Sequence, residues 1–159
     1  FVHRNVANVI GEDDPNCMSV VEFAVGSLRV DHIIVCGHHR CGGVQAAAGP
    51  AADGRVHAWV QGIRDVAAAS SLDFANGGVA ATDRLAEINV ARQVINVART
   101  DVVQQVWEAG HAVRVHGWVF AVASGRLVDL GYTVSNAAEL SDLEDRWPAL
   151  LEAQGPVAE

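Results

Sequence analysis

The sequence predicts an α/β fold, with a mainly parallel β-sheet of about four strands plus an edge strand, flanked by helices. Three observations favour this fold. Short runs of β-branched residues end at turn residues, longer segments carry apolar residues at helical spacing, and the two kinds of segment alternate along the chain. The chain has 159 residues, half of them hydrophobic, which is enough to bury one core. We therefore expect a single domain over residues 1–159.

The first part of the chain predicts a strand, a helix and a second strand. Residues 1–10 alternate apolar and polar side chains early and are rich in valine, which is typical of a strand. Residues 17–30 place apolar side chains at helical spacing, and residues 31–37 form a β-branched run that ends in glycine. Two strands joined by a crossover helix run parallel, and ligands bind such sheets beyond the carboxyl ends of the strands.

The remainder predicts helices that cover the sheet, followed by two strands and a last helix. Apolar residues recur at helical spacing in three segments, and a short turn containing glycine separates two β-branched runs. The expected elements are helices over residues 57–70, 81–98 and 101–110, two strands within residues 111–134, and a terminal helix over residues 141–152.

Charge and composition exclude two classes of partner. The net charge is −8, and the basic residues are all arginines that form no cluster. Nucleic-acid and anionic-membrane binding rest on clustered basic residues, so we expect neither partner. No apolar run reaches the roughly 18 residues of a membrane-spanning helix. Three cysteines are too few for a disulfide framework, which favours reduced thiols and a cytoplasmic location.

The stretch VCGHHRCGGVQ, residues 35–45, places metal-binding side chains at the end of the second predicted strand. His38 and Cys41 lie on one side of a helical first turn, so a ring nitrogen and a thiolate sulfur can reach one zinc ion. Gly42 and Gly43 leave the backbone N–H groups open to a ligand. The spacing alone is a weak signal, because a cysteine at a strand end is more often a small buried residue. A catalytic zinc also normally has three protein ligands.

Several segments resemble, in order and separation, the β-class carbonic anhydrases, and the resemblance covers nearly the whole chain. These segments are FVHRNVAN, NCMSVVEFAV, HIIVCGHHRCGGVQAA, GIRDV, EINVARQVINV, VRVHGWVF and GRLVDL. In that family the C-G-H-x-x-C segment supplies a histidine and a cysteine to zinc, which implies His38 and Cys41 as metal ligands. The next residue, Gly42, is implied to offer its backbone N–H to the substrate. The resemblance therefore implies a lyase that uses zinc to interconvert carbon dioxide and bicarbonate.

The resemblance also implies partners and a second enzyme activity. The family assembles as homodimers or multiples of dimers, with active sites at the subunit interface, and we expect the same assembly here. Relatives hydrolyse carbonyl sulfide or carbon disulfide with the same metal chemistry. Hydrolysis of these linear molecules is therefore kept as an alternative to the hydration of carbon dioxide.

One part of the family's metal centre has no match in this sequence. The family's first zinc cysteine lies in a C-x-D-x-R motif, together with an aspartate–arginine pair, upstream of the segment that matches residues 1–5. The 159 residues contain no such motif. We expect either an N-terminally incomplete sequence or a degenerate homologue that acts as a binding or scaffold subunit. The 159 residues by themselves are expected to be inactive, because they lack an essential thiolate.

Arg4 matches an arginine that, in one subgroup of these enzymes, helps to hold a bicarbonate ion at a noncatalytic site. The alternative role of Arg4 is a structural ion pair. In the subgroup a tyrosine two residues after the tryptophan of H-G-W completes the site, and Phe120 occupies that position here. Phenylalanine has no hydroxyl to donate, so we expect weak or absent bicarbonate inhibition of this type.

Other histidine, cysteine and tryptophan side chains are expected to be structural. Cys36 is expected to pack within the buried strand, with a role as substitute zinc ligand as the alternative, and Cys17 is expected to be a buried thiol. His39 follows His38, and adjacent side chains diverge, so we expect it to be exposed or at an interface. His116 and Trp118 are expected to be core and packing groups.

Overall fold

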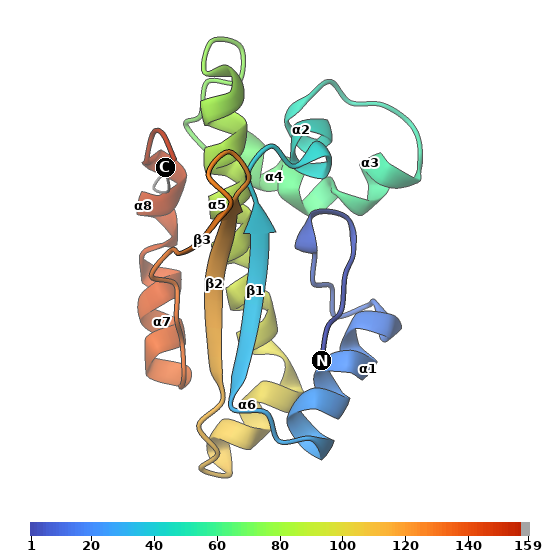
Figure 1. Ribbon diagram of the computed structural model, residues 1–159, viewed down its shortest axis with the longest axis vertical. Coiled ribbons are helices and arrows are strands. Elements are labelled where there is room, and N and C mark those ends of the chain that lie inside the picture. Colours follow the sequence, from blue (N-terminus) through green and yellow to red (C-terminus); the bar gives the residue numbers. More distant parts are fainter. Residues whose placement is uncertain (157–159) are drawn as a thin grey trace.

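The computed structural model describes residues 1–156, and these residues form a three-stranded sheet with helices around it (Figure 1). The strands are β1 (His32–His38), β2 (Arg114–Ala121) and β3 (Arg126–Asp129), and they lie in this order across the sheet. β1 and β2 are parallel, and β2 and β3 form an antiparallel hairpin. The α/β fold class is confirmed.

Helices and helical turns make up most of the rest of the chain. In chain order they are η1 (Val6–Asn8), α1 (Pro15–Glu22), η2 (Phe23–Ser27), α2 (Gly42–Ala48), α3 (Arg55–Trp59), α4 (Gln61–Ala69), α5 (Gly78–Arg99), α6 (Asp101–Glu108), α7 (Ala137–Asp145) and α8 (Trp147–Glu152). Figure 1 shows α5 behind the sheet, α7 and α8 on the side of β2, and α1 to α4 on the side of β1.

The long helix α5 packs across one face of the sheet and forms the centre of the core. Val90 and Val94 of α5 belong to one hydrophobic cluster with Val35 of β1 and with Val115 and Val119 of β2. All five are almost completely buried. Burial of a side chain of this size contributes about 1.5–3 kcal/mol. The contact between α5 and the sheet is therefore a main source of stability, and it fixes β1 relative to α5.

The opposite face of the sheet is open among the described residues. Side chains alternate along a strand, so Val35 and Gly37 are buried beneath α5, whereas Ile34, Cys36 and His38 point the other way and are exposed. Ile34 is 48% exposed although it is apolar. His38, which the sequence motif predicts to be a metal ligand, therefore lies on the open face.

The prediction of a strand that runs into a loop within residues 1–10 is wrong, and so is the expected number of strands. The described residues form three strands rather than about four plus an edge strand. Val6–Asn8 form a short 3-10 turn, and the Asn5 side chain bonds both the N–H and the carbonyl of Val9, at 2.9 and 2.7 Å. A strand needs a neighbour for its backbone hydrogen bonds, and residues 1–5 pair with no strand in the described part of the chain. The parallel pair is β1 with β2 instead.

The later elements are confirmed with shifted bounds. β1 begins and ends one residue after the predicted strand over residues 31–37, and α5 contains all of the helix predicted over residues 81–98. The helix predicted over residues 57–70 is interrupted at Val60 into α3 and α4. The terminal helix predicted over residues 141–152 is divided between α7, which begins earlier, and α8. The apolar periodicity therefore located these helices, although it did not show where they break.

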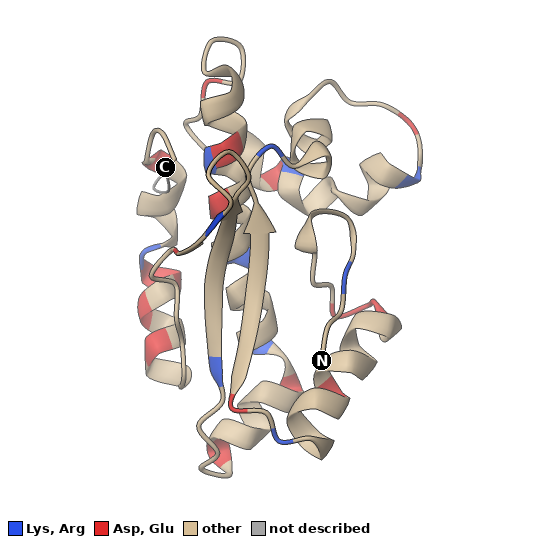
Figure 2. Ribbon diagram, in the orientation of Figure 1, with Lys and Arg blue, Asp and Glu red and all other residues tan. Residues whose placement is uncertain are grey.

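Charged side chains are distributed without a basic patch over the described surface. Figure 2 shows acidic residues concentrated on α7 and arginines scattered over several elements. No helix within residues 1–156 has both the length and the apolar character that crossing a membrane requires.

Candidate functional site

The candidate site lies where β1 ends and α2 begins. His38 is the last residue of β1, and Cys41 is the N-cap residue of α2. Cys41 is 6% exposed, whereas His38 is exposed on the open face of the sheet. The carboxyl end of a parallel strand is the usual place for a ligand in an α/β sheet. The structure therefore places the two sequence-predicted ligands at opposite ends of one short turn.

The ring of His38 is fixed by a hydrogen bond to the main chain. Its Nδ1 lies 2.9 Å from the carbonyl oxygen of His39. A carbonyl oxygen can only accept, so Nδ1 carries the hydrogen and donates it. In the neutral ring the lone pair then lies on Nε2, and Nε2 is the atom that His38 can offer to a metal ion.

His39 is buried, which corrects the expectation that it is exposed or at an interface. It is 8% exposed, and its Nε2–H donates to Glu87 Oε1 at 3.0 Å. Arg84 Nη1 donates to the other carboxylate oxygen of Glu87 at 3.2 Å. His39 follows His38, so its side chain points toward the face that α5 covers. The alternation of the strand was the signal in the sequence that could have predicted this burial.

A second carboxylate of α5 contacts the same turn. Arg40 has a φ of 56°, which is uncommon for a residue other than glycine, and its backbone N–H donates to Asp83 Oδ1 at 2.6 Å. This bond helps to stabilise the left-handed backbone that turns the chain from β1 into α2. Neither Asp83 nor Glu87 was a candidate from the sequence, because both lie far along the chain from the motif.

The two glycines after Cys41 differ in their surroundings. Gly42 is exposed, and a β-carbon built on it meets nothing within 4 Å. As the first residue of α2, Gly42 has no intrahelical acceptor for its N–H, which leaves that group available to a small ligand. A β-carbon on Gly43 would lie 2.8 Å from Val6 Cγ1 and 3.0 Å from Ala7 Cβ. Gly43 therefore allows η1 to pack closely against α2.

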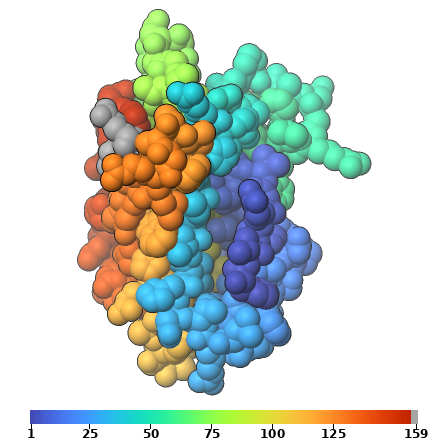
Figure 3. Space-filling model, viewed as in Figure 1, coloured from blue at the N-terminus to red at the C-terminus, as the bar shows by residue number. Residues whose placement is uncertain are grey.

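A groove of about 910 Å³ runs from the turn along β1. Figure 3 shows the dark blue N-terminal residues on one side of it and the cyan of β1 on the other. Its lining includes His38 and Cys36 of β1, Phe120 of β2, and Arg4 of the N-terminal segment. Arg4 is exposed, and no ion pair of its side chain occurs among residues 1–156. The structure thus puts Arg4 and Phe120 on the same groove.

The donor atoms of the turn suit zinc, but they are too few for a complete site. One imidazole nitrogen and one thiolate sulfur are typical zinc ligands. Over the described part of the chain, no three His, Cys, Asp or Glu side chains are arranged to hold a metal ion. His38 and Cys41 can therefore offer two ligands, whereas a catalytic zinc site normally has three protein ligands.

The other two cysteines lie outside the turn between His38 and Cys41, in α1 and β1. Cys17 is buried, as expected, and burial together with the nearby charge of Asp14 raises the pKa of its thiol. Cys36 is exposed, which corrects the expectation that it packs in a buried strand; partial burial still raises the pKa of its thiol. The reason is again the alternation of β1, because Cys36 shares the open face with His38.

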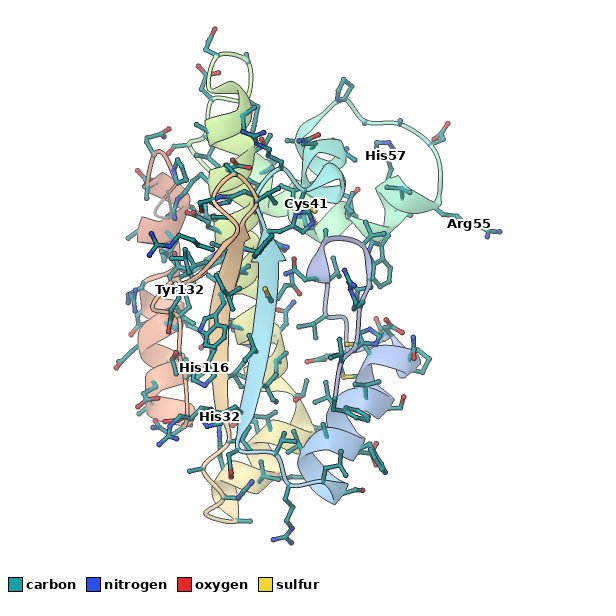
Figure 4. All side chains as sticks on the ribbon, viewed as in Figure 1. His32, Cys41, Arg55, His57, His116 and Tyr132 are labelled. Carbon is teal, nitrogen blue, oxygen red and sulfur yellow. The ribbon has the colours of Figure 1, made fainter. Side chains whose placement is uncertain are left out.

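His116 and Trp118 also lie on the open face, not in the core as expected. Both are half-buried, and Nε2 of His116 lies 2.9 Å from Nδ1 of His32. Burial, followed by the nearby charge of His32, lowers the pKa of His116. Figure 4 shows His32 and His116 near one end of the sheet and Cys41 beyond the other end. This histidine pair is therefore separate from the candidate site.

Comparisons with known proteins agree on one family. A family model described as carbonic anhydrase matches residues 1–127. A carbonic anhydrase of Emericella nidulans is 46% identical over 132 residues, which cover 82% of this chain and 58% of the relative. One of Pseudomonas aeruginosa is 32% identical over 133 residues, which cover 80% of this chain and 60% of the relative. The chain thus spans less than two thirds of the length of these relatives.

Solved structures show the same similarity in three dimensions. A Coccomyxa β-carbonic anhydrase in complex with acetazolamide has a TM-score of 0.80 and 33% identity, with coverage of 97% of this chain and 68% of that one. A tetrameric β-carbonic anhydrase of Sordaria macrospora has a TM-score of 0.77 and 32% identity, with coverage of 84% and 69%. The residues 1–127 that match the family model include the turn that holds His38 and Cys41. The chain belongs to the β-class carbonic anhydrases.

Proposed function

We propose that the protein catalyses the reversible hydration of carbon dioxide to bicarbonate and a proton, with zinc as its cofactor. The observation that carries this proposal is the hydrogen bond from His38 Nδ1 to the carbonyl of His39, which leaves Nε2 free, one short turn from the Cys41 thiol. Family membership supports the reaction. A bound zinc ion would supply a Lewis acid that activates water at neutral pH.

The residues of this chain hold and orient the reacting groups. His38 and Cys41 are proposed to supply two of the three protein ligands that a catalytic zinc normally has. Gly42 is proposed to donate its exposed backbone N–H to an oxygen of the substrate, where developing negative charge strengthens the hydrogen bond. The open space beside Gly42 leaves room for a molecule as small as carbon dioxide.

We propose that the protein acts as a homodimer or a multiple of dimers. The tetrameric relative from Sordaria macrospora supports this assembly. The open face of the sheet supports it too, because Ile34, Phe120 and Leu127 are 48%, 39% and 52% exposed there. Apolar side chains gathered on one face are typical of an interaction surface.

The free thiols of Cys17, Cys36 and Cys41 support a reducing compartment such as the cytoplasm.

The proposal is tested by stopped-flow measurement of carbon dioxide hydration with the native protein and its variants. We expect Cys41→Ser to lower kcat/KM by more than about 100-fold, because loss of a ligand should exceed the ten- to hundredfold effect of losing a neighbour of a ligand. Cys17→Ala is the matched control, since it removes a buried thiol of α1 away from the turn. Equal activity of wild type and Cys41→Ser would contradict the proposal.

The same measurement separates the alternatives. A native protein that does not hydrate carbon dioxide but hydrolyses carbonyl sulfide or carbon disulfide would have the same metal chemistry with a different substrate. A native protein that is inactive on all three molecules would be a noncatalytic member of the family.

A further inference from the structure

Two carboxylates of α5 contact successive residues of the turn between His38 and Cys41. Asp83 and Glu87 are four residues apart, so they lie on one side of the helix. Asp83 accepts the backbone N–H of Arg40 at 2.6 Å, and Glu87 accepts the ring N–H of His39 at 3.0 Å. The turn is therefore attached to the most buried helix at two points, once by its main chain and once by a side chain.

All members of the contact with Glu87 are buried. The exposed fractions of Glu87, Arg84 and His39 are 0%, 1% and 8%. Arg84 donates to the second oxygen of Glu87 at 3.2 Å, and its other terminal nitrogen lies 3.4 Å from the carbonyl of Leu150 on α8. The carboxylate is thus held from one side by Arg84, and it holds His39 from the other. A charged hydrogen bond of this kind is stronger than a neutral one.

The position of His39 determines which nitrogen His38 can offer. The carbonyl of His39 accepts the Nδ1–H of His38 at 2.9 Å. We infer that Asp83 and Glu87 are positioning residues, which fix the main chain of residues 39–40 so that His38 stays in the Nδ1–H form with its Nε2 lone pair free for zinc. This inference rests on the proposed role of His38 as a ligand. Asp83 and Glu87 thus position the turn from a helix that is distant in sequence but adjacent in the fold.

The physical effect is a lower cost of organising the ligand before the metal binds. His38 is exposed, so its ring is not held by packing on the open face, and the bond to His39 is what selects one tautomer. Hydrogen-bonded neighbours of a metal ligand typically change metal affinity ten- to hundredfold when they are removed. Loss of Asp83 or Glu87 should act in the same way, through the main chain of the turn.

The first test measures the tautomer of His38 in the metal-free protein, by NMR of histidines labelled with ¹⁵N. Asp83→Ala removes the acceptor for Arg40 N–H, and Asp83→Asn keeps an acceptor oxygen in the same place. We expect the Nδ1–H form in wild type and in Asp83→Asn, and a mixture of tautomers in Asp83→Ala. Gln93→Ala is the matched control, because it removes another buried polar side chain of α5, one that bonds Ile10 N–H instead of the turn.

The second test measures zinc affinity by competition with a chelator, on the same variants and on Glu87→Leu and Glu87→Gln. We expect affinity to fall about tenfold in Asp83→Ala and Glu87→Leu and to stay within about twofold in Asp83→Asn, Glu87→Gln and Gln93→Ala. Glu87→Leu leaves Arg84 without its carboxylate partner. If this variant does not fold, the comparison of Asp83→Ala with Asp83→Asn tests the inference.

The inference is overturned if Asp83→Ala has the tautomer and the zinc affinity of wild type. A wild-type protein that binds no zinc would instead contradict the proposed function. In that case the NMR measurement, which needs no metal, still decides whether α5 sets the tautomer of His38.

Discussion

Gly37 of β1 and Val90 of α5 pack so closely that a β-carbon built on Gly37 would lie 2.6 Å from Val90 Cγ2. Gly37 directly precedes His38, so this contact sets the distance between the end of β1 and α5. Gly117, on the neighbouring strand β2, makes a similar approach, with a β-carbon 3.1 Å from Val90 Cγ1. The absence of side chains at two strand positions lets α5 lie close enough to reach the turn.

Gly37→Ala is expected to destabilise the fold by about 1–3 kcal/mol, because the added methyl group overpacks the core. Urea unfolding measures the change in the free energy of unfolding. Gly62→Ala on α4 is the control, since a β-carbon there meets nothing within 4 Å. Adding Val90→Ala to Gly37→Ala should recover part of the loss, and a fully stable Gly37→Ala variant would show that the contact is not tight.

Gly42 and Gly43 are expected to respond differently to alanine. Gly43→Ala should destabilise by about 1–3 kcal/mol, because its β-carbon would meet Val6 and Ala7. Gly42→Ala should leave the free energy of unfolding nearly unchanged, because the space beside it is open. Thermal unfolding compares the two variants. Hydrogen exchange should also be faster over residues 5–10 in Gly43→Ala, and equal losses in both variants would contradict this packing.

The pKa of His116 predicts how stability depends on pH. Burial and the nearby charge of His32 lower this pKa from the ordinary histidine value of 6.5. As the pH falls through that value, the unfolded chain binds the proton before the folded chain does, so the free energy of unfolding decreases. We expect His116→Gln to make this decrease shallower as the pH falls below 6.5. His32→Gln removes one of the causes that lower this pKa and should lie between His116→Gln and wild type. Three identical pH profiles from chemical unfolding would be inconsistent with this role of His116.

Bicarbonate is expected to inhibit the protein weakly or not at all through the noncatalytic site considered for Arg4. Arg4 and Phe120 line one groove, but the phenyl ring offers no hydroxyl to a bicarbonate ion. We expect a bicarbonate titration of the native enzyme below pH 8 to show no cooperative loss of activity. A steep cooperative loss that disappears in Arg4→Ala would show that Arg4 holds bicarbonate without a hydroxyl partner.

The parts of the fold that were predictable from the sequence are those fixed by local pattern. The β-branched run of β1 and the helical spacing of α5 carry their own signal, since β1 buries one face and α5 buries most of its residues. Residues 1–10 carry the same kind of pattern without forming a strand. A strand depends on a neighbour for its hydrogen bonds, and this requirement is not visible in a local pattern.

The candidate site was predictable only where its residues are close in sequence. His38 and Cys41 share one motif, and the family resemblance gave that motif its meaning. Asp83 and Glu87 reach the turn from 43 and 48 residues away, so no spacing rule connects them to it. The burial of His39 was open to prediction, because it follows the alternation of β1.

The zinc content of the purified native protein tests the central claim most directly. Elemental analysis of wild type and of the double variant His38→Ala and Cys41→Ser, at matched protein concentration, compares the metal bound per chain. We predict about one zinc per chain in wild type and none in the double variant, because both proposed ligands of this chain are then lost. A wild-type protein without zinc, or a double variant that retains it, would contradict the account.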